Sequence, residues 1–366
     1  MRRRRSPMAD TRTAGGHSTV RSPEEPAPAF VLDIGGTWTR AATCSPDAGP
    51  TVITKVRTPS RTNEPDAPVE SLVERLVDLI VDLLPARGPS TVAISLGAML
   101  DHDRGVVYGS APLWGELAAD VPFTSRLRAR RPDVRWVVTN DVSAMLAAYR
   151  ASHPELANAR VVVTTVSSGI AARTDEPSSG AITTDPAGLQ GEIGHLPAVT
   201  GELHLPCACG SRDHVAAFAS GPGLRAVAQA LTAQAPAGSV TPAAAERRHG
   251  EFEAVFARAL DGDDPFAHRV LDEATRPLAD VFTYLLTTQP ATERIVLTGG
   301  VIDAIGPHYR RAVLRRMRDR GVHHTARHHP DWLESVVVLA GSPDETSPIL
   351  GAALLAADPP GGGAWA

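Results

Sequence analysis

Short apolar segments that end in small or polar residues recur along this chain. The segment 30–34 leads into a Gly-Gly-Thr sequence and a second apolar stretch from Arg40, which predicts a β-hairpin with a tight glycine turn. Apolar residues over 69–84 recur at the spacing of one helix face and stop at Pro85, which predicts a helix. Further strands are expected over 91–96 and 134–139, and a second helix over 142–150.

The second half of the chain repeats this order of elements. An apolar, β-branched run over 160–166 leads into a Ser-Ser-Gly segment, and a similar run over 294–298 leads into Gly-Gly. A helix is expected from Ile302 onward, a strand over 336–339 and a small-residue helix over 349–357. Strands that alternate with helices indicate an α/β protein. Two similar halves indicate a duplicated, two-lobed molecule with a cleft between the lobes.

The composition excludes several classes of partner. Hydrophobic residues make up 43% and charged residues 21% of the 366 residues, which is typical of a soluble globular chain. Aromatic residues are 4% and the net charge is −5, so a nucleic-acid partner is not expected. No apolar run has the length of a membrane-spanning helix, so no membrane partner is expected. Three cysteines and a thiolate metal site fit a reducing, cytoplasmic location.

The two ends of the chain differ from the rest in composition. Residues 1–28 are rich in Pro, Ser, Gly and charge and lack the apolar segment of a secretory signal, so we expect a disordered tail. Its arginines leave a basic contact arm as an alternative, and Met8 is another candidate initiator. Residues 358–366 are expected to form a second disordered tail.

A Cys-x-Cys sequence with flanking histidines predicts a metal site. Two thiolates and two imidazoles form a ligand set typical of structural zinc, and two cysteines one residue apart rarely form a disulfide. The predicted Zn²⁺ ligands are His195, Cys207, Cys209 and His214. His204 and Asp213 are alternative ligands, and two ordinary cysteines with a chance histidine are the alternative interpretation. Glu192, one helical turn before the first histidine, is left free to bind a polar ligand.

Three glycine-containing turns are candidate phosphate or nucleotide sites. Asp33 ends a predicted strand and is followed by Gly35, Gly36 and Thr37. Glycine allows close approach of an anion to the backbone, and the carboxylate is a natural partner of Mg²⁺. The Ser168–Gly169 segment and the Gly299–Gly300 segment follow later strands. Taken alone, a plain structural turn or loop is the better explanation of the first two, and it explains the Gly299–Gly300 segment equally well.

The Asn140-Asp141 pair lies between a predicted strand and a predicted helix. Both residue types are favoured helix N-caps. A carboxylate at a helix start is also suited to take a proton from a substrate hydroxyl, as phosphoryl transfer requires. The two roles are compatible.

In this order, the motifs resemble those of the ROK family, a branch of the sugar kinase, heat-shock and actin superfamily. The resemblance covers about residues 30–357. Each motif is weak alone, but their order and spacing together are specific. They are Asp33-Ile-Gly-Gly-Thr37, Asn140-Asp141, Gly191-Glu-Ile-Gly-His195, Cys207-Ala-Cys209-Gly210, Ser220-Gly221, Thr298-Gly-Gly300 and Leu350-Gly-Ala-Ala353.

The resemblance implies a two-lobed, actin-like ATPase fold of the ribonuclease H-like class. An N-terminal lobe over 29–140, completed by a C-terminal helix over 345–357, would face a C-terminal lobe over 141–344 that carries the zinc loop. ATP and Mg²⁺ would bind in the cleft, a small-molecule sugar or cyclitol would be the acceptor, and the chain would form a homodimer.

The resemblance also implies a role for each motif. Asp141 would be the catalytic base. The substrate hydroxyls would be held by Asn140, Glu192 and His195, the last of which is also a zinc ligand. The phosphates would face Asp33, Gly35, Gly36, Thr37, Ser168 and Gly169, and the nucleoside would lie near Thr298, Gly299 and Gly300.

The departures from the family pattern concern the acceptor. The glutamate that closes the zinc loop in the family, and reaches hydroxyls near the anomeric end of a hexose, is Ala216 here. An unpaired buried hydroxyl costs about 1–3 kcal/mol. We therefore expect a substrate with a hydroxymethyl group but a different ring. C7-cyclitols of the valienol or valiolone type, substrates of ROK-like kinases in actinomycete secondary metabolism, match this description. The alternatives are a hexose or N-acetylhexosamine kinase and a non-catalytic sugar sensor.

Overall fold

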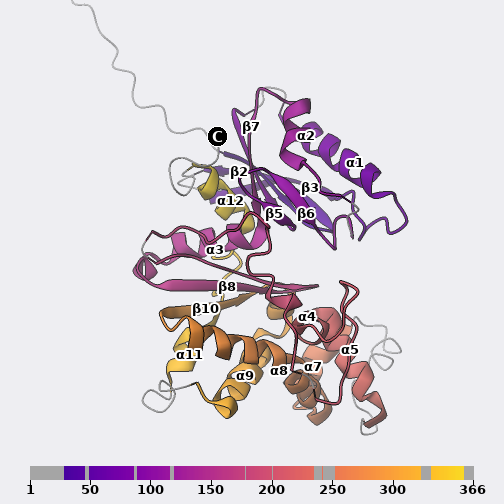
Figure 1. The fold of residues 1–366 in the computed structure, drawn as a ribbon, viewed down its shortest axis with the longest axis vertical. Helices are drawn as coiled ribbons and strands as arrows, with labels where there is room; N and C mark the ends of the chain where they lie inside the picture. Colours follow the sequence, from indigo (N-terminus) through magenta and orange to yellow (C-terminus); the bar gives the residue numbers. More distant parts are fainter. Residues whose placement is uncertain are drawn as a thin grey trace, which may run out of the picture.

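The computed structural model describes residues 29–45, 49–85, 89–115, 119–177, 179–199, 201–234, 241, 252–322 and 331–357. The predicted tails, 1–28 and 358–366, lie outside the described residues. Two sheets lie in two lobes, one above the other in Figure 1. The predicted two-lobed α/β architecture is confirmed.

The first sheet has five strands in the order β3-β2-β1-β4-β7. The β1–β2 and β2–β3 pairs are antiparallel, and β4 is parallel to both β1 and β7. Its strands are β1 (Ala29–Ile34), β2 (Trp38–Ser45), β3 (Gly49–Arg57), β4 (Thr91–Leu96) and β7 (Arg135–Asn140). The predicted hairpin over 30–40 is therefore formed, and its partner strands follow in the expected order.

Helices cover both faces of this sheet. Phe30, Leu32 and Ile34 of β1 point into a core with α1 (Val69–Asp82) and α2 (Phe123–Arg130). Val31 points to the other face, where α12 (Pro348–Ala357) packs. Burial on both faces explains why the strand reads as a continuous apolar run. Figure 1 shows α12, in yellow, beside the N-terminal strands of the upper lobe.

The second sheet has four strands in the order β11-β10-β8-β9. Its β8–β9 pair is antiparallel, and β10 is parallel to β8 and to β11. The strands are β8 (Arg160–Val166), β9 (Ile170–Thr174), β10 (Thr292–Thr298) and β11 (Val337–Leu339). In the second sheet, the β9–β8 hairpin is therefore followed by the parallel strands β10 and β11. In the first sheet, the β2–β1 hairpin is followed in the same way by the parallel strands β4 and β7. The two lobes therefore share the repeated plan that the sequence indicated.

Most of the remaining helices pack beneath the second sheet in the lower lobe, and α3 (Asp141–Ser152) contacts elements of both lobes. The core beneath the second sheet comes from α4 (Val215–Ala219), α5 (Gly221–Leu231), α7 (Phe252–Asp261), α8 (Pro265–Thr288), α9 (Gly300–Arg320) and α11 (Trp332–Val336). Helix α3 contacts α12 and also β8 and β9. Smaller elements are β5 (Met99–Asp101), β6 (Val106–Gly109), η1 (Pro154–Leu156), η2 (Ile193–His195) and η3 (Thr232–Gln234).

The strand and helix limits differ from the sequence predictions by one or two residues at several ends. Strand β7 begins after Val134, whose N–H donates to the carbonyl of Arg131 in a turn, and it extends to Asn140, which pairs with Leu96. Val336 belongs to α11 rather than to the following strand. Among the described helices, none is long and apolar enough to cross a membrane.

Candidate active site and metal centre

Asn140 caps the helix that follows the first sheet. Its Oδ1 accepts hydrogen bonds from the N–H groups of Val142 (2.9 Å) and Ser143 (3.2 Å). Its Nδ2 donates to the carbonyl of Ala98 at 2.9 Å, and the side chain is buried. The predicted cap is therefore formed. One hydrogen of the amide remains for the predicted contact with a substrate hydroxyl.

Asp141 is the first residue of α3 and lies among charged groups from both lobes. Burial and, to a lesser extent, the negative charge of Asp33 raise the pKa of its carboxyl group, and the positive charge of Arg173 opposes them, with a net pKa of about 6. A carboxylate with a pKa near the working pH is well suited to accept a proton. The role of Asp141 as the base stays a prediction, and the raised pKa is compatible with it.

Asp33 is tied to its neighbours on both sides in the first sheet. Arg40, its cross-strand partner on β2, donates from Nε at 2.9 Å and from Nη2 at 2.5 Å to Oδ2. Ser95 on β4 donates to Oδ1 at 3.0 Å. The side chain is buried, and these donors fix its orientation. Each oxygen accepts from one residue, which leaves acceptor capacity toward a hydrated cation.

Three of the predicted nucleotide glycines have no packing reason to be glycine. A Cβ on Gly169 would meet nothing within 4 Å, one on Gly300 would meet only Ser167 Oγ at 3.8 Å, and one on Gly35 only the carbonyl of Trp38 at 3.7 Å. None of the three has a positive φ. Their missing side chains therefore leave open backbone, which is what a bound phosphate or nucleoside needs.

Two other glycines are required by the fold itself. A Cβ on Gly36 would lie 2.5 Å from Cβ of Pro112, and one on Gly299, where φ is +100°, would lie 2.8 Å from the carbonyl of Val166. Thr298 is buried, with its hydroxyl 2.9 Å from that of Thr346. Packing and backbone geometry therefore explain why Gly36, Gly299 and Thr298 are present. Thr37 and Ser168 are exposed at the tips of their hairpins.

Glu192 lies beside a buried arginine that the sequence analysis missed. Its Oε1 is 3.5 Å from Nη2 of Arg173 on β9, whose side chain is 2% exposed. Burial raises the pKa of Glu192, and the arginine opposes that rise. The available signal was an arginine inside the apolar strand sequence Ile-Ala-Ala-Arg-Thr, because a charged residue is rarely buried without a partner.

The four predicted metal ligands converge. Ligand atoms of His195, Cys207, Cys209 and His214 all lie within 4.8 Å of one another. The Sγ of Cys209 is 3.2 Å from Nδ1 of His214, and the Sγ of Cys207 is 3.9 Å from Nδ1 of His195. Tetrahedral zinc with nitrogen and sulfur ligands requires separations of about 3.3–3.8 Å. The donor chemistry of this set fits zinc, and the two nitrogen–sulfur distances lie within about 0.1 Å of that range, so small shifts of the side chains would complete a tetrahedral site.

The two alternative ligands pair with each other instead. Nδ1 of His204 is 2.9 Å from Oδ2 of Asp213, and Oδ1 of Asp213 accepts from the N–H of Leu205. Asp213 adopts a positive φ of 58°, which turns the chain so that His214 faces the cysteines. The carboxylate therefore supports the shape of the loop and stays outside the ligand cluster.

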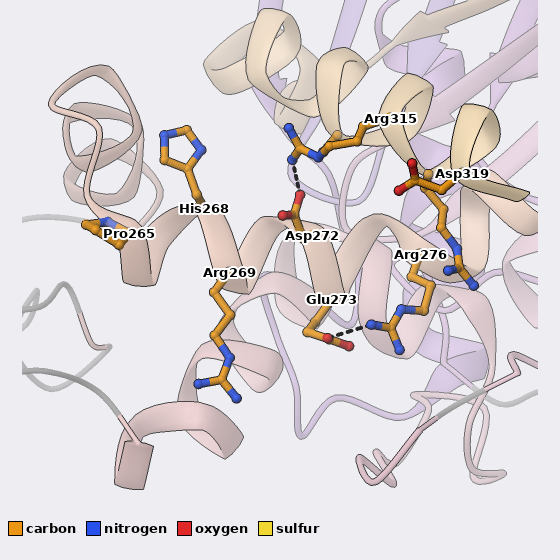
Figure 2. A pocket seen from close by; sticks show the side chains of 10 residues that line it. Pro265, His268, Arg269, Asp272, Glu273, Arg276, Arg315 and Asp319 are labelled. Atoms are coloured by element: carbon orange, nitrogen blue, oxygen red, sulfur yellow. Dashed lines mark hydrogen bonds and ion pairs between the residues drawn. The ribbon is translucent and has the colours of Figure 1, made fainter.

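A separate pocket of about 540 Å³ opens between α8 and α9, away from these residues. Figure 2 shows Arg315 pointing to Asp272 and Arg276 to Glu273, and both pairs are ion pairs. Its charged lining is thus largely self-compensating. None of the predicted site residues lines it.

Comparison with known proteins identifies the family. A sequence model of the ROK family matches residues 29–359, and the chain belongs to this family. It is 39% identical over 335 residues to the 2-epi-5-epi-valiolone 7-kinase of an Actinoplanes species, which covers 90% of this chain and 92% of the relative. It is 35% identical over 227 residues to the C(7)-cyclitol 7-kinase of Streptomyces hygroscopicus subsp. jinggangensis, with 61% and 62% coverage.

Solved structures support the same fold. The ROK family glucokinase from Streptomyces griseus, in complex with glucose and AMPPNP, aligns with a TM-score of 0.66 at 21% identity. The alignment covers 90% of this chain and 99% of that chain. The predicted family and fold class are confirmed.

Proposed function

We propose that this chain is an ATP-dependent kinase that phosphorylates the 7-hydroxyl of a C7-cyclitol of the valienol or valiolone type. The observation that carries this proposal is the 39% identity, over 90% of the chain, to 2-epi-5-epi-valiolone 7-kinase. Both cyclitol relatives and the glucokinase neighbour are named as kinases, which supports a phosphotransferase with an alcohol acceptor.

The residues present fit ATP and Mg²⁺. Open backbone at Gly35, Gly169 and Gly300 comes from both lobes, and the Asp33 side chain lies next to the first of these turns. We assign phosphate contacts to the turns at Gly35 and Gly169, the nucleoside to the turn at Gly300, and Mg²⁺ to Asp33. Bound ATP would supply the phosphoryl group, and Mg²⁺ would offset the negative charge of the phosphates.

Asp141 moves the proton in this mechanism. The carboxylate takes the proton from the hydroxymethyl oxygen as that oxygen forms a bond to the γ-phosphorus of ATP, and the bond from this phosphorus to the bridging oxygen breaks to release ADP. Asn140 offers its remaining amide hydrogen to the acceptor, while Glu192 and His195 accept or donate hydrogen bonds at the ring hydroxyls. A histidine has two ring nitrogens, so His195 can serve the metal with one and the acceptor with the other.

Zinc has a structural role in this proposal. The chain around the metal cluster is already joined by backbone hydrogen bonds from Val215 N–H to the carbonyl of Leu196 and from Ala198 N–H to that of Asp213. A metal bound by His195 and His214 would add a cross-link at one end of this pairing. It would thereby hold Glu192, three residues before His195, in place.

Ala216 supports an acceptor without the anomeric end of a hexose. It lies in the first turn of α4, partly exposed, two residues after the proposed ligand His214. A methyl group at this position accepts no hydrogen bond, so an anomeric hydroxyl placed there would lose a partner. A cyclitol has no ring oxygen and no anomeric carbon.

We also propose the remaining features that the resemblance implies. The first lobe comprises 29–140 together with 345–357, supported by the packing of α12 on the first sheet, and the second comprises 141–344. The protein acts in the cytoplasm as a homodimer. Light scattering coupled to gel filtration tests the dimer.

An ADP-release assay with ATP and Mg²⁺ tests the proposed function. The acceptors are valienol- and valiolone-type cyclitols, glucose, mannose, N-acetylglucosamine and N-acetylmannosamine, with Asp141→Asn as the inactive control. Selective turnover of a cyclitol supports the proposal. Equal or better turnover of a hexose rejects the cyclitol acceptor and indicates an ordinary sugar kinase. No turnover by a folded, zinc-containing protein rejects the kinase and indicates a sugar sensor.

A further inference from the structure

Arg173 is a buried cation for which the proposed mechanism has no use. It lies on β9, at the edge of the second sheet, with its side chain 2% exposed. Its Nη1 donates to the carbonyl of Ala172 at 2.9 Å, and its Nη2 is 3.5 Å from Oε1 of Glu192. A guanidinium has five N–H donors, and burying one is costly unless it is paired.

The backbone brings Glu192 to this arginine. The N–H of Ala172 donates to the carbonyl of Gly191 at 2.8 Å. Gly191 has a φ of +75°, and a Cβ there would lie 1.7 Å from the carbonyl oxygen of Ala172 and 2.9 Å from Nη1 of Arg173. The glycine is therefore required for the contact. The residue before Glu192 is thus held against β9. His195 of the metal cluster follows three residues after Glu192, so the segment is held at both of its ends.

The same guanidinium acts on the proposed base. The charged groups that act on Asp141 are Asp33 from β1, Glu192 from the following loop and Arg173 from β9. Asp33 and Glu192 raise the pKa of Asp141, whereas Arg173 and the N–H of Val142 lower it. Arg173 is the one cation among these groups, and Asp33 has a cation of its own in Arg40. Removal of Arg173 therefore takes away the positive charge that acts on Asp141 and Glu192.

We propose that Arg173 is the positioning residue of the acceptor site, which fixes the Glu192 carboxylate against β9 and balances the charge around Asp141. This inference rests on the proposed function. Arg173 would thereby do two things: it would orient the substrate-binding Glu192, and it would keep Asp141 more readily ionised.

Two substitutions separate these tasks. Arg173→Met removes the charge and the donors while keeping the length of the side chain, and Arg173→Lys keeps the charge but loses the planar fork. In Arg173→Met, KM for the acceptor should rise roughly ten- to hundred-fold, with KM for ATP unchanged. The acid limb of kcat/KM should move to higher pH. In Arg173→Lys, the acid limb should return toward that of the wild type, while KM for the acceptor stays raised.

Arg150→Met is the matched control. Its guanidinium is also mostly buried and pairs with Asp175, two residues beyond Arg173, with Nε 2.8 Å from Oδ2. This variant should lose stability without moving the acid limb or the acceptor KM. If it moves both as Arg173→Met does, or if Arg173→Met moves neither, the inference is wrong. If Arg173→Met does not fold, the unchanged acceptor KM of a folded Arg173→Lys would overturn it.

A second measurement is independent of turnover. Titration of the ¹³C-labelled aspartate carboxyl groups by NMR, with Asp141 assigned from Asp141→Asn, gives the pKa of Asp141 in each variant. A higher value in Arg173→Met than in the wild type and in Arg173→Lys supports the inference. Equal values in all three overturn it, even where the wild type phosphorylates none of the acceptors and the proposed function itself has failed.

Discussion

Gly351 of α12 lies against Ala144 of α3 so closely that a Cβ on the glycine would be 1.7 Å from the alanine carbonyl oxygen. Ile349, Ala352 and Ala353 of the same helix are buried against the first sheet. Helix α3 begins with Asp141. Helix α12 therefore supports the helix that presents the proposed base.

Gly351→Ala should destabilise the protein by about 1–3 kcal/mol or more, because the added methyl group meets backbone that cannot move aside. The change has the opposite sign to the intrinsic preference of a helix for alanine over glycine. Denaturant unfolding measures it. Leu354→Ala, at a position of α12 that is 37% exposed, is the control and should change stability far less. Equal stabilities of the two variants would contradict the close contact.

The rate should follow the ionisation of Asp141. Because this carboxyl group must be ionised to accept a proton and its pKa is raised to about 6, kcat/KM for the acceptor should fall below pH 6, by up to ten-fold per pH unit. Direct chromatography of ADP measures it without coupling enzymes. Asp141→Asn should lose roughly two to four decades of rate. A flat profile between pH 5 and pH 7, or near-native turnover by the variant, would show that Asp141 is not the base.

The raised pKa of Asp141 should also make its charge a cost to stability. The pKa in the folded protein, about 6, exceeds the ordinary value of 3.8, so stability is fully present below pH 3.8 and is lost as pH rises through 6. Asp141→Asn should therefore be more stable than the wild type at pH 8, by up to about 3 kcal/mol, and this gain should shrink toward pH 5.

Asp133→Asn is the control for this stability effect, because the Arg131 guanidinium lowers the pKa of that exposed carboxyl group. A lowered pKa gives stability that is present above the ordinary value and lost as pH falls. This control should show no gain at pH 8. Urea unfolding at several pH values measures both variants, and a pH-independent difference for Asp141→Asn would count against the raised pKa.

Purified protein should contain one zinc ion per chain, measurable by mass spectrometry of the elements. Cys209→Ala should lose the metal, lower the melting temperature and raise KM for the acceptor more than KM for ATP, because the metal holds the segment of Glu192. Cys44→Ala is the control, since this buried cysteine lies in the core beneath α12. Full zinc content in Cys209→Ala would refute the ligand set.

The open and the packed glycines should respond differently to one methyl group. Gly169→Ala should keep its stability, since a Cβ meets nothing within 4 Å, but should raise KM for ATP. Gly299→Ala should be destabilised by about 1–3 kcal/mol, because φ is +100° and the Cβ would lie 2.7 Å from Thr165 Oγ1. Unchanged KM for ATP in Gly169→Ala would remove the argument that this turn cradles phosphate.

Sequence reasoning succeeded where a local pattern determines a local structure. The strands over 91–96 and 160–166 were predicted with their exact limits, because both are apolar runs bounded by polar or small residues. The four predicted metal ligands stand out because thiolates and imidazoles are few and lie close in sequence, and the structure brings their ligand atoms together. Asn140 was ambiguous, since an N-cap and a substrate ligand use the same side chain, and the structure shows the cap directly.

The sequence by itself determined the alternation of strands and helices, the two similar halves and the residue types of each motif. Only the tertiary structure decided that Arg173 faces Glu192 and that Gly351 touches Ala144, because these contacts join elements far apart in the chain. The elevated pKa of Asp141 likewise arises from burial and from charges on other strands. Periodicity and spacing report which face of an element is buried, whereas the partner on that face is set by how the sheets and helices pack.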